Sequence, residues 1–169
     1  MIMIKNEKKI IFDKLSPYLI NNKIIDGLID EILEVEKIKK EDFYSLFPYQ
    51  TKSLCIYFFN RKNTHIKNIN KKKVLKQKSI SKKVTIYLDE TFVFFEENKA
   101  LSLFFFNYLV LHPFLLNKIS LCFANFVWIE VKDKSVDFNY YSKRYILSKI
   151  YKNSLFYWRQ TSDYNKTIN

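Results

Sequence analysis

The sequence predicts an all-α fold that forms one compact unit, and three observations lead to this expectation. The 169 residues include one glycine and three prolines, which leaves little material for the tight turns that join β-strands. Apolar residues recur at helical spacing along most of the chain. Apolar residues make up 48% of the chain and aromatic residues 18%, which is ample material for a core.

Residues 1–55 are expected to form three helices. The apolar pattern predicts amphipathic helices over 8–21 and 23–37. A third, short helix is predicted over 40–47, and it should end before Pro48 because proline cannot continue a helix. Three short helices in succession suggest a part that resembles a helix-turn-helix.

This part does not carry the charges that DNA recognition needs. The third helix opens with Glu41 and Asp42. A recognition helix presents its first residues to bases and phosphates, and two carboxylates there would be repelled. DNA binding is therefore not expected.

Residues 56–99 are interpreted as a basic segment followed by a connecting helix. The formal net charge is +12, and between Phe43 and Leu88 the sequence has eleven basic residues and no acidic one. Such a run can be a solvated linker, or it can attract anionic lipid or the phosphates of a nucleic acid. The candidates for contact with a membrane surface are Lys71, Lys72 and Lys73. Helical phase over Ile80–Lys99 outweighs the strand propensity of VTIYL.

The most apolar stretch lies in the C-terminal region, residues 100–169. Residues 100–117 carry no charge, which raises the question of a membrane span. The pair His112 and Pro113 interrupts this stretch, and proline favours the first turn of a new helix. Two buried helices, over 98–111 and 113–131, are therefore predicted instead of a span.

A long amphipathic helix is predicted from Ser135 to Gln160, with Ser135 as its N-cap. The residues expected on its buried face are Tyr140, Leu147, Ile150, Tyr151, Ser154 and Trp158. Those expected on its exposed face are Asp137, Tyr141, Arg144, Ser148, Lys152 and Arg159.

Part of this region resembles a known family, the ubiquinone-biosynthesis accessory proteins of the Coq-nine type. The residues that carry the resemblance are Ala124, Trp128, Asp133, Ser135, Asp137-Phe138-Asn139-Tyr140-Tyr141, Lys143-Arg144 and Tyr157-Trp158. The resemblance implies a TetR-like helical bundle that binds an isoprenoid quinone precursor, is not itself an enzyme, and presents this lipid to the demethoxyubiquinone hydroxylase. It also leaves a homodimer open.

The resemblance suggests two sets of site residues. The candidates for lining a lipid cavity are Phe104, Leu109, Phe123, Trp128, Leu147, Tyr151 and Trp158. The candidates for docking the hydroxylase are Asp137, Tyr140, Tyr141 and Arg144. The family usually has tryptophan where this chain has Tyr140, which is a departure from the family pattern. Adjacent residues of a helix lie about 100° apart, and Tyr141 is expected on the charged face, so it is the stronger candidate of the two.

No catalytic, cofactor-binding or metal-binding pattern competes with this interpretation. His65 and His112 are isolated, and Cys55 and Cys122 lie far apart. The opening residues lack the apolar run of a signal peptide, so a bacterial, cytoplasmic protein is expected. The basic run adds the expectation that it associates peripherally with the inner face of the cytoplasmic membrane. The alternative function is a TetR-like DNA-binding transcription regulator with an apolar effector pocket.

Overall fold

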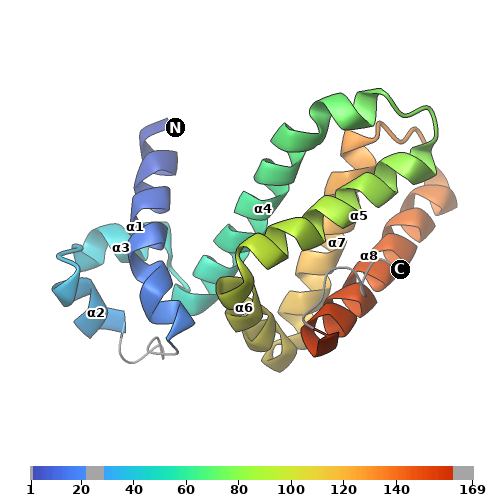
Figure 1. Cartoon of the computed structure of the whole chain (residues 1–169). Coiled ribbons are helices and arrows are strands. Elements are labelled where there is room, and N and C mark those ends of the chain that lie inside the picture. Colours follow the sequence, from blue (N-terminus) through green and yellow to red (C-terminus); the bar gives the residue numbers. More distant parts are fainter. Residues whose placement is uncertain (1, 22–28, 162–169) are drawn as a thin grey trace. The chain divides into compact units, whose positions relative to one another are not determined.

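The computed structural model describes residues 2–21 and 29–161, and the regular elements in these ranges are all α-helices, which confirms the all-α class (Figure 1). The chain divides into two compact units, Met1–Phe58 and Phe59–Asn169. The elements are α1 Ile2–Ile20, α2 Ile29–Val35, α3 Lys40–Leu46, α4 Gln50–Leu75, α5 Ile80–Glu97, α6 Lys99–Leu111, α7 Pro113–Glu130 and α8 Asp137–Thr161.

The first unit contains α1, α2, α3 and the start of α4. Its core holds aromatic side chains, and the rings of Phe43 and Phe47 stack with their centroids 5.6 Å apart. The helix α3 ends before Pro48, as predicted. Of the helix predicted over 23–37, the described part is α2, and residues 22–28 lie outside the described ranges.

The second unit is built from the remainder of α4 and from α5 to α8. The helix α7 packs along α8 and also contacts α5 and α6, while α6 contacts both α5 and α8 (Figure 1). The core of this unit is rich in aromatic rings. Its buried aromatic residues are Phe59, Tyr87, Phe92, Phe94, Phe95, Phe105, Phe106, Phe123, Tyr151 and Trp158.

Most of the basic run is helical, so the alternative that it is a linker is wrong, although most of its described basic side chains are solvated. It spans much of α4 and the start of α5. Buried residues occur in α4 at Phe59, Lys62 and Ile66, which are three and four positions apart and so share one helix face. This buried stripe gives α4 a face to pack, and that requires a helix. The prediction of helix for VTIYL is confirmed, because it lies in α5.

The apolar stretch is divided as predicted. The helix α6 ends at Leu111, and Pro113 occupies the first turn of α7, where its missing N–H is not needed. Within residues 2–21 and 29–161, no helix combines the length and hydropathy of a membrane span.

The start of α8 differs from the expectation. The helix begins at Asp137 and not directly after Ser135. Instead of capping the helix, the Ser135 hydroxyl donates a hydrogen bond to the carboxylate of Asp133. A nearby acceptor thus competes successfully for the hydroxyl that was expected to cap the helix.

Three assignments of residues to the faces of α8 are also wrong. Arg144 and Ser148 were expected on the exposed face and are buried, whereas Ile150 was expected on the buried face and is 47% exposed. The buried stripe of the helix consists of Arg144, Leu147, Ser148, Tyr151, Leu155 and Trp158. Its polar members can be buried because they have hydrogen-bond partners: Ser148 donates to the carbonyl of Tyr145 on the same helix, and Arg144 donates to Asn125 on α7.

Candidate functional site

The most unusual group in the second unit is the amine of Lys62, which lies inside the core. The residue sits on α4 and is 1% exposed. Four aromatic rings surround its Nζ atom. The distances from Nζ to the ring centroids are 4.1 Å for Phe123, 4.8 Å for Tyr151, 5.5 Å for Phe95 and 5.7 Å for Phe59. We call these four rings and the amine the Lys62 cage.

The polar contacts of this amine are few. Nζ donates a hydrogen bond to the Tyr151 hydroxyl at 3.1 Å. Within the described ranges no carboxylate forms an ion pair with it. Burial therefore holds the pKa of Lys62 well below its ordinary value, because the charged form is poorly solvated in the core.

Several of the predicted lipid-lining residues lie around this cage. Phe123 and Tyr151 belong to it, and their rings stack with centroids 4.1 Å apart. Trp158 is buried next to it, with its ring centroid 5.5 Å from that of Phe95, and donates from Nε1 to Glu96 at 2.7 Å. The structure thus brings together three of the seven predicted residues.

The other four predicted lipid-lining residues are not part of the cage. Leu109 and Leu147 are buried in the core, and Phe104 is only half-buried. Trp128 is also half-buried and donates from Nε1 to the carbonyl of Lys143 at 3.2 Å. The amine of Lys143 lies 5.3 Å from the Trp128 ring centroid. Because these contacts tie Trp128 to the first half of α8, it is a weaker candidate than Phe123, Tyr151 or Trp158.

Sequence reasoning missed Lys62 as a core residue. It was counted among the eleven basic residues of a surface run, because lysine is rarely buried without a partner. The signal that could have identified it is its spacing. Phe59, Lys62 and Ile66 occur at positions i, i+3 and i+7, so Lys62 lies on the apolar stripe of α4.

A second candidate site lies on the outside of α8, where three aromatic side chains are exposed. Phe138 is 81% exposed, Tyr141 is 72% exposed and Tyr145 is 56% exposed. Their spacing of three and four residues places them on one helix face. We call these three residues the aromatic stripe. Of the three, only Tyr141 was predicted as a docking residue.

The other predicted docking residues have different surroundings. Asp137 is exposed at the start of α8. Tyr140 is half-buried, with the guanidinium carbon of Arg144 3.4 Å from its ring centroid. The Arg144 side chain also donates to Asn125 Oδ1 at 2.9 Å and to the carbonyl of Tyr140 at 3.0 Å. Arg144 therefore lies beneath the surface.

A buried carboxylate fixes this end of α8. The Asp133 side chain is 3% exposed, and it accepts a hydrogen bond from Lys143 at 2.9 Å and forms an ion pair with Arg144 at 3.7 Å. Although burial alone would raise the pKa of Asp133, hydrogen bonds from Ser135 and Lys143 hold it below its ordinary value. The ionised carboxylate thus ties the turn before α8 to the first half of the helix.

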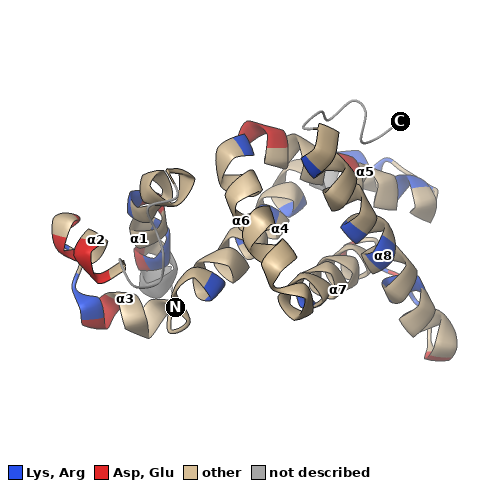
Figure 2. Cartoon of the chain, turned by 90° about the horizontal axis from the view of Figure 1, so that it is seen from below, with Lys and Arg blue, Asp and Glu red and all other residues tan. Residues whose placement is uncertain are grey.

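The charge of the chain is divided unequally. The first unit has nine basic and nine acidic residues, so the second unit carries the whole net charge of +12. The helix α8 has one acidic residue, Asp137, and five basic ones. In Figure 2 the acidic segments are prominent on α2 and α3, whereas α8 shows mainly basic ones.

A groove of about 240 Å³ between α7 and α8 is lined in part by Lys149 and Lys152.

The predicted membrane-surface lysines are only partly described. The side chains of Lys71 and Lys72 lie outside the described residues. Lys73 is exposed, and its Nζ lies 2.6 Å from the Glu90 carboxylate. Contact between these lysines and a membrane stays a prediction.

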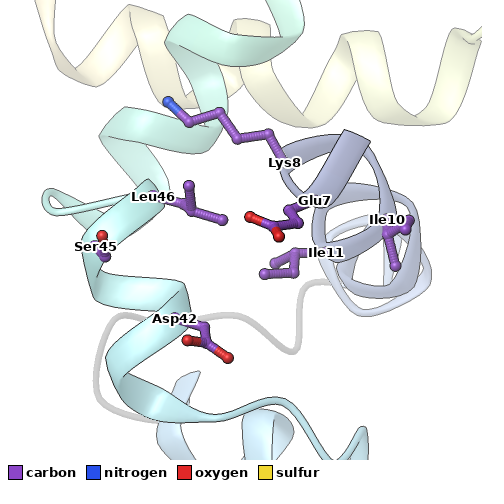
Figure 3. Close-up of a pocket in the computed structure, with 7 residues that line it drawn as sticks. All are labelled: Glu7, Lys8, Ile10, Ile11, Asp42, Ser45 and Leu46. Atoms are coloured by element: carbon purple, nitrogen blue, oxygen red, sulfur yellow. The ribbon is translucent and has the colours of Figure 1, made fainter. Parts of the chain in front are cut away.

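The first unit has a groove of about 490 Å³ between α1 and α3 (Figure 3). Its lining residues include two carboxylates, Glu7 and Asp42, together with Ile10, Ile11 and Leu46. Glu41 and Asp42 are both exposed on the first turn of α3. These charges would repel phosphates at the start of α3.

Within the described ranges, no three His, Cys, Asp or Glu side chains lie together in a way that could hold a metal ion. The two candidate sites are therefore the Lys62 cage and the aromatic stripe.

Comparison with known proteins gives one match, in the C-terminal part of the chain. The family model COQ9 matches residues 118–169, which contain all of α8 and most of α7. This match confirms the resemblance to the Coq-nine type of ubiquinone-biosynthesis protein. The aromatic stripe lies within the matched range, as do Phe123, Tyr151 and Trp158. No curated protein and no solved structure matches the chain.

Proposed function

Because α8 and most of α7 are COQ9-type sequence, we propose that this protein is a non-enzymatic lipid-binding accessory protein of ubiquinone biosynthesis. In this function the second unit binds an isoprenoid quinone precursor, and α8 docks on the demethoxyubiquinone hydroxylase that receives it. The observation that carries the proposal is the aromatic stripe, since it is an exposed apolar surface within the segment that matches the family.

The stripe has the properties of a protein-binding surface. Large aromatic side chains bury much area on binding and lose little rotamer entropy, and tyrosine is common among interface anchors. The side chains beneath it are fixed by the hydrogen bonds of Arg144 and Asp133. A surface held in this way is organised before the partner arrives, which lowers the entropic penalty of binding.

Replacement of Tyr141 tests the docking surface. Tyr141→Ala is expected to weaken binding to the hydroxylase by about 2 to 4 kcal/mol, the range of an anchor residue. The free energy of unfolding should change by no more than about 0.5 kcal/mol, because the side chain is exposed. Binding would be measured by titration against the purified hydroxylase, and unfolding by urea denaturation.

The matched control is Tyr157→Ala, an exposed tyrosine on the same helix. Tyr157 is sixteen residues after Tyr141, which at 100° per residue places it on a different face of α8. Its replacement should leave hydroxylase binding unchanged. Equal losses for both variants would mean that the aromatic stripe is not the docking surface.

Arg144 is expected to act through folding and not through direct contact. Arg144→Ala removes the hydrogen bonds to Asn125 and Tyr140 and leaves the buried Asp133 carboxylate with fewer partners. We expect the free energy of unfolding to fall by about 1 to 3 kcal/mol, the penalty for buried polar groups left unsatisfied. Urea denaturation measures this, and an unchanged midpoint would show that the Arg144 contacts add no stability.

The lipid part of the proposal is supported by the family match and by the apolar, aromatic composition of the core of the second unit. Purified protein should release an isoprenoid lipid on organic extraction, detectable by mass spectrometry, and native mass spectrometry should show the corresponding complex. A lipid-free protein that instead retards DNA in a gel would contradict the proposal and favour a transcription regulator.

Attraction to a membrane is proposed from the charge of the second unit. The protein is expected to sediment with vesicles of anionic phospholipid, and 0.5 M salt, with a Debye length of roughly 4 to 5 Å, should release it. Replacing Lys71, Lys72 and Lys73 together with glutamine should weaken the binding. Salt-independent binding to neutral vesicles would show that apolar insertion and not charge provides the attachment.

A further inference from the structure

The Lys62 cage contains a polar group whose bonding capacity is not used within the described part of the chain. A lysine amine has three N–H donors when charged, or two donors and a lone pair when neutral. One hydrogen bond, to the Tyr151 hydroxyl, is made, and the remaining surroundings are the faces of aromatic rings. Ring faces attract a cation, but they are weaker acceptors than a carbonyl oxygen.

Packing of the core does not by itself require an amine at position 62. A methionine has nearly the same length and would fill the same space without the desolvation penalty of a buried amine. The described residues hold one other buried basic side chain, that of Arg144, and it has the carboxylate of Asp133 and the amide of Asn125 as partners. Lys62 differs because no carboxylate or amide of the described residues is its partner.

On this basis we propose that Lys62 binds a carbonyl oxygen on the planar quinone head group of the lipid, so that the cage is the head-group site of the second unit. This inference rests on the proposed lipid-binding function. The amine donates to the carbonyl, and the cage rings pack against the planar head group. Phe123 and Tyr151 already stack on each other at 4.1 Å, which is the geometry a planar ring would adopt in place of one of them.

The position of the cage in the unit fits this role. Its four rings come from α4, α5, α7 and α8, so a head group bound there would contact four of the helices of the second unit. Phe123 and Tyr151 also lie in the segment that matches the family. Because the amine is enclosed, the head group must displace at least one ring, and we expect association to be slow compared with diffusion.

A head-group site of this chemistry prefers one class of lipid. A benzoquinone with an isoprenoid tail offers both a carbonyl and a planar ring, whereas an isoprenoid alcohol with the same tail offers neither. A fatty acid offers a carboxylate, but it has no ring to replace one in the cage. The quinone is therefore expected to bind most tightly of the three.

The test compares these ligands on the full chain and on two variants. The ligands are a ubiquinone with a three-unit isoprenoid tail, farnesol, which has the same tail without the ring, and palmitate. Wild type should bind the quinone at least 10-fold more tightly than farnesol or palmitate. Lys62→Met should lose about 10- to 100-fold in quinone affinity, the effect of one hydrogen bond to a buried donor, with farnesol affinity unchanged.

The second variant, Lys67→Met, removes an exposed amine of the same helix that lies outside the cage and pairs with Glu130. It should keep the wild-type affinity for the quinone and for farnesol, because the cage is intact. If Lys62→Met loses quinone and farnesol affinity in equal proportion, Lys62 has only a structural role and the inference is wrong. Tighter binding of palmitate than of the quinone by wild type would also overturn it.

The outcomes separate this inference from the proposed function. If wild type binds the quinone and farnesol, but Lys62→Met binds the quinone as wild type does, the lipid-binding function stands and the head-group assignment fails. If wild type binds none of the three ligands, the lipid-binding function itself is wrong, and the inference falls with it.

Discussion

Trp158→Ala is expected to lower the free energy of unfolding by about 3 to 5 kcal/mol, the range for truncating a large aromatic residue in a core. Trp158 is 1% exposed and packs against Phe95. Its removal leaves a cavity and also deprives the Glu96 carboxylate of the hydrogen bond from Nε1. The change in the free energy of unfolding is measured by urea denaturation monitored by circular dichroism.

The control for this variant is Tyr157→Ala, at the neighbouring exposed position, which should change stability by no more than about 0.5 kcal/mol. Since Trp158 adjoins the Lys62 cage, its loss should also release any bound lipid. A Trp158→Ala protein with wild-type stability would mean that this side chain is not part of a packed core.

Lys62→Met is expected to have the opposite effect on stability. Burial of the amine without a carboxylate partner disfavours its charged form, and methionine removes this penalty while keeping the volume. We expect the free energy of unfolding to rise by about 1 to 4 kcal/mol near pH 7, as found when buried charged groups are replaced by apolar ones. The measurement is again urea denaturation.

The pH dependence gives an independent check on this explanation. Because burial lowers the pKa of Lys62 in the folded state, the unfolded chain binds more protons between that lowered pKa and the ordinary value of 10.5. Wild-type stability should therefore gain from this residue as the pH rises toward 10.5, and the advantage of Lys62→Met should shrink over the same range. An advantage that does not depend on pH would exclude charge desolvation as its cause.

An exposed lysine of the same helix provides the control. Lys67 is half-exposed and pairs with Glu130 at 2.6 Å. Lys67→Met should lower the free energy of unfolding by no more than about 1 kcal/mol, the range for an exposed ion pair, and it should not raise it. A stabilisation as large as that of Lys62→Met would mean that any added apolar side chain on α4 stabilises the protein.

Sequence reasoning located most of the helices because their ends depend on local chemistry. Pro48 and Pro113 mark ends that follow from the missing N–H and fixed φ of proline, and the structure has them where they were expected. Helical phase also decided correctly between helix and strand for α5. The resemblance to the COQ9 family was likewise carried by a short local segment, which the family model matches.

The candidate sites were less predictable, because they depend on contacts between helices. The sequence placed Tyr141 on the exposed face of α8, but it also placed Arg144 there. Burial of Arg144 is decided by Asn125 and Asp133, which accept its hydrogen bond and ion pair from outside α8. With Arg144 buried, the exposed aromatic side chains of this part of α8 are Phe138, Tyr141 and Tyr145.

Contacts between helices also explain why the Lys62 cage was not predicted. By itself the sequence determined the helical class, the helix ends at prolines and the segment that resembles the family, since each depends on residues close together in the chain. Only the tertiary structure decided that Lys62, one of eleven basic residues in a run, lies among rings from four helices. Tyr151, which accepts its hydrogen bond, is 89 residues away, and a helical period does not specify which distant side chain a residue will meet.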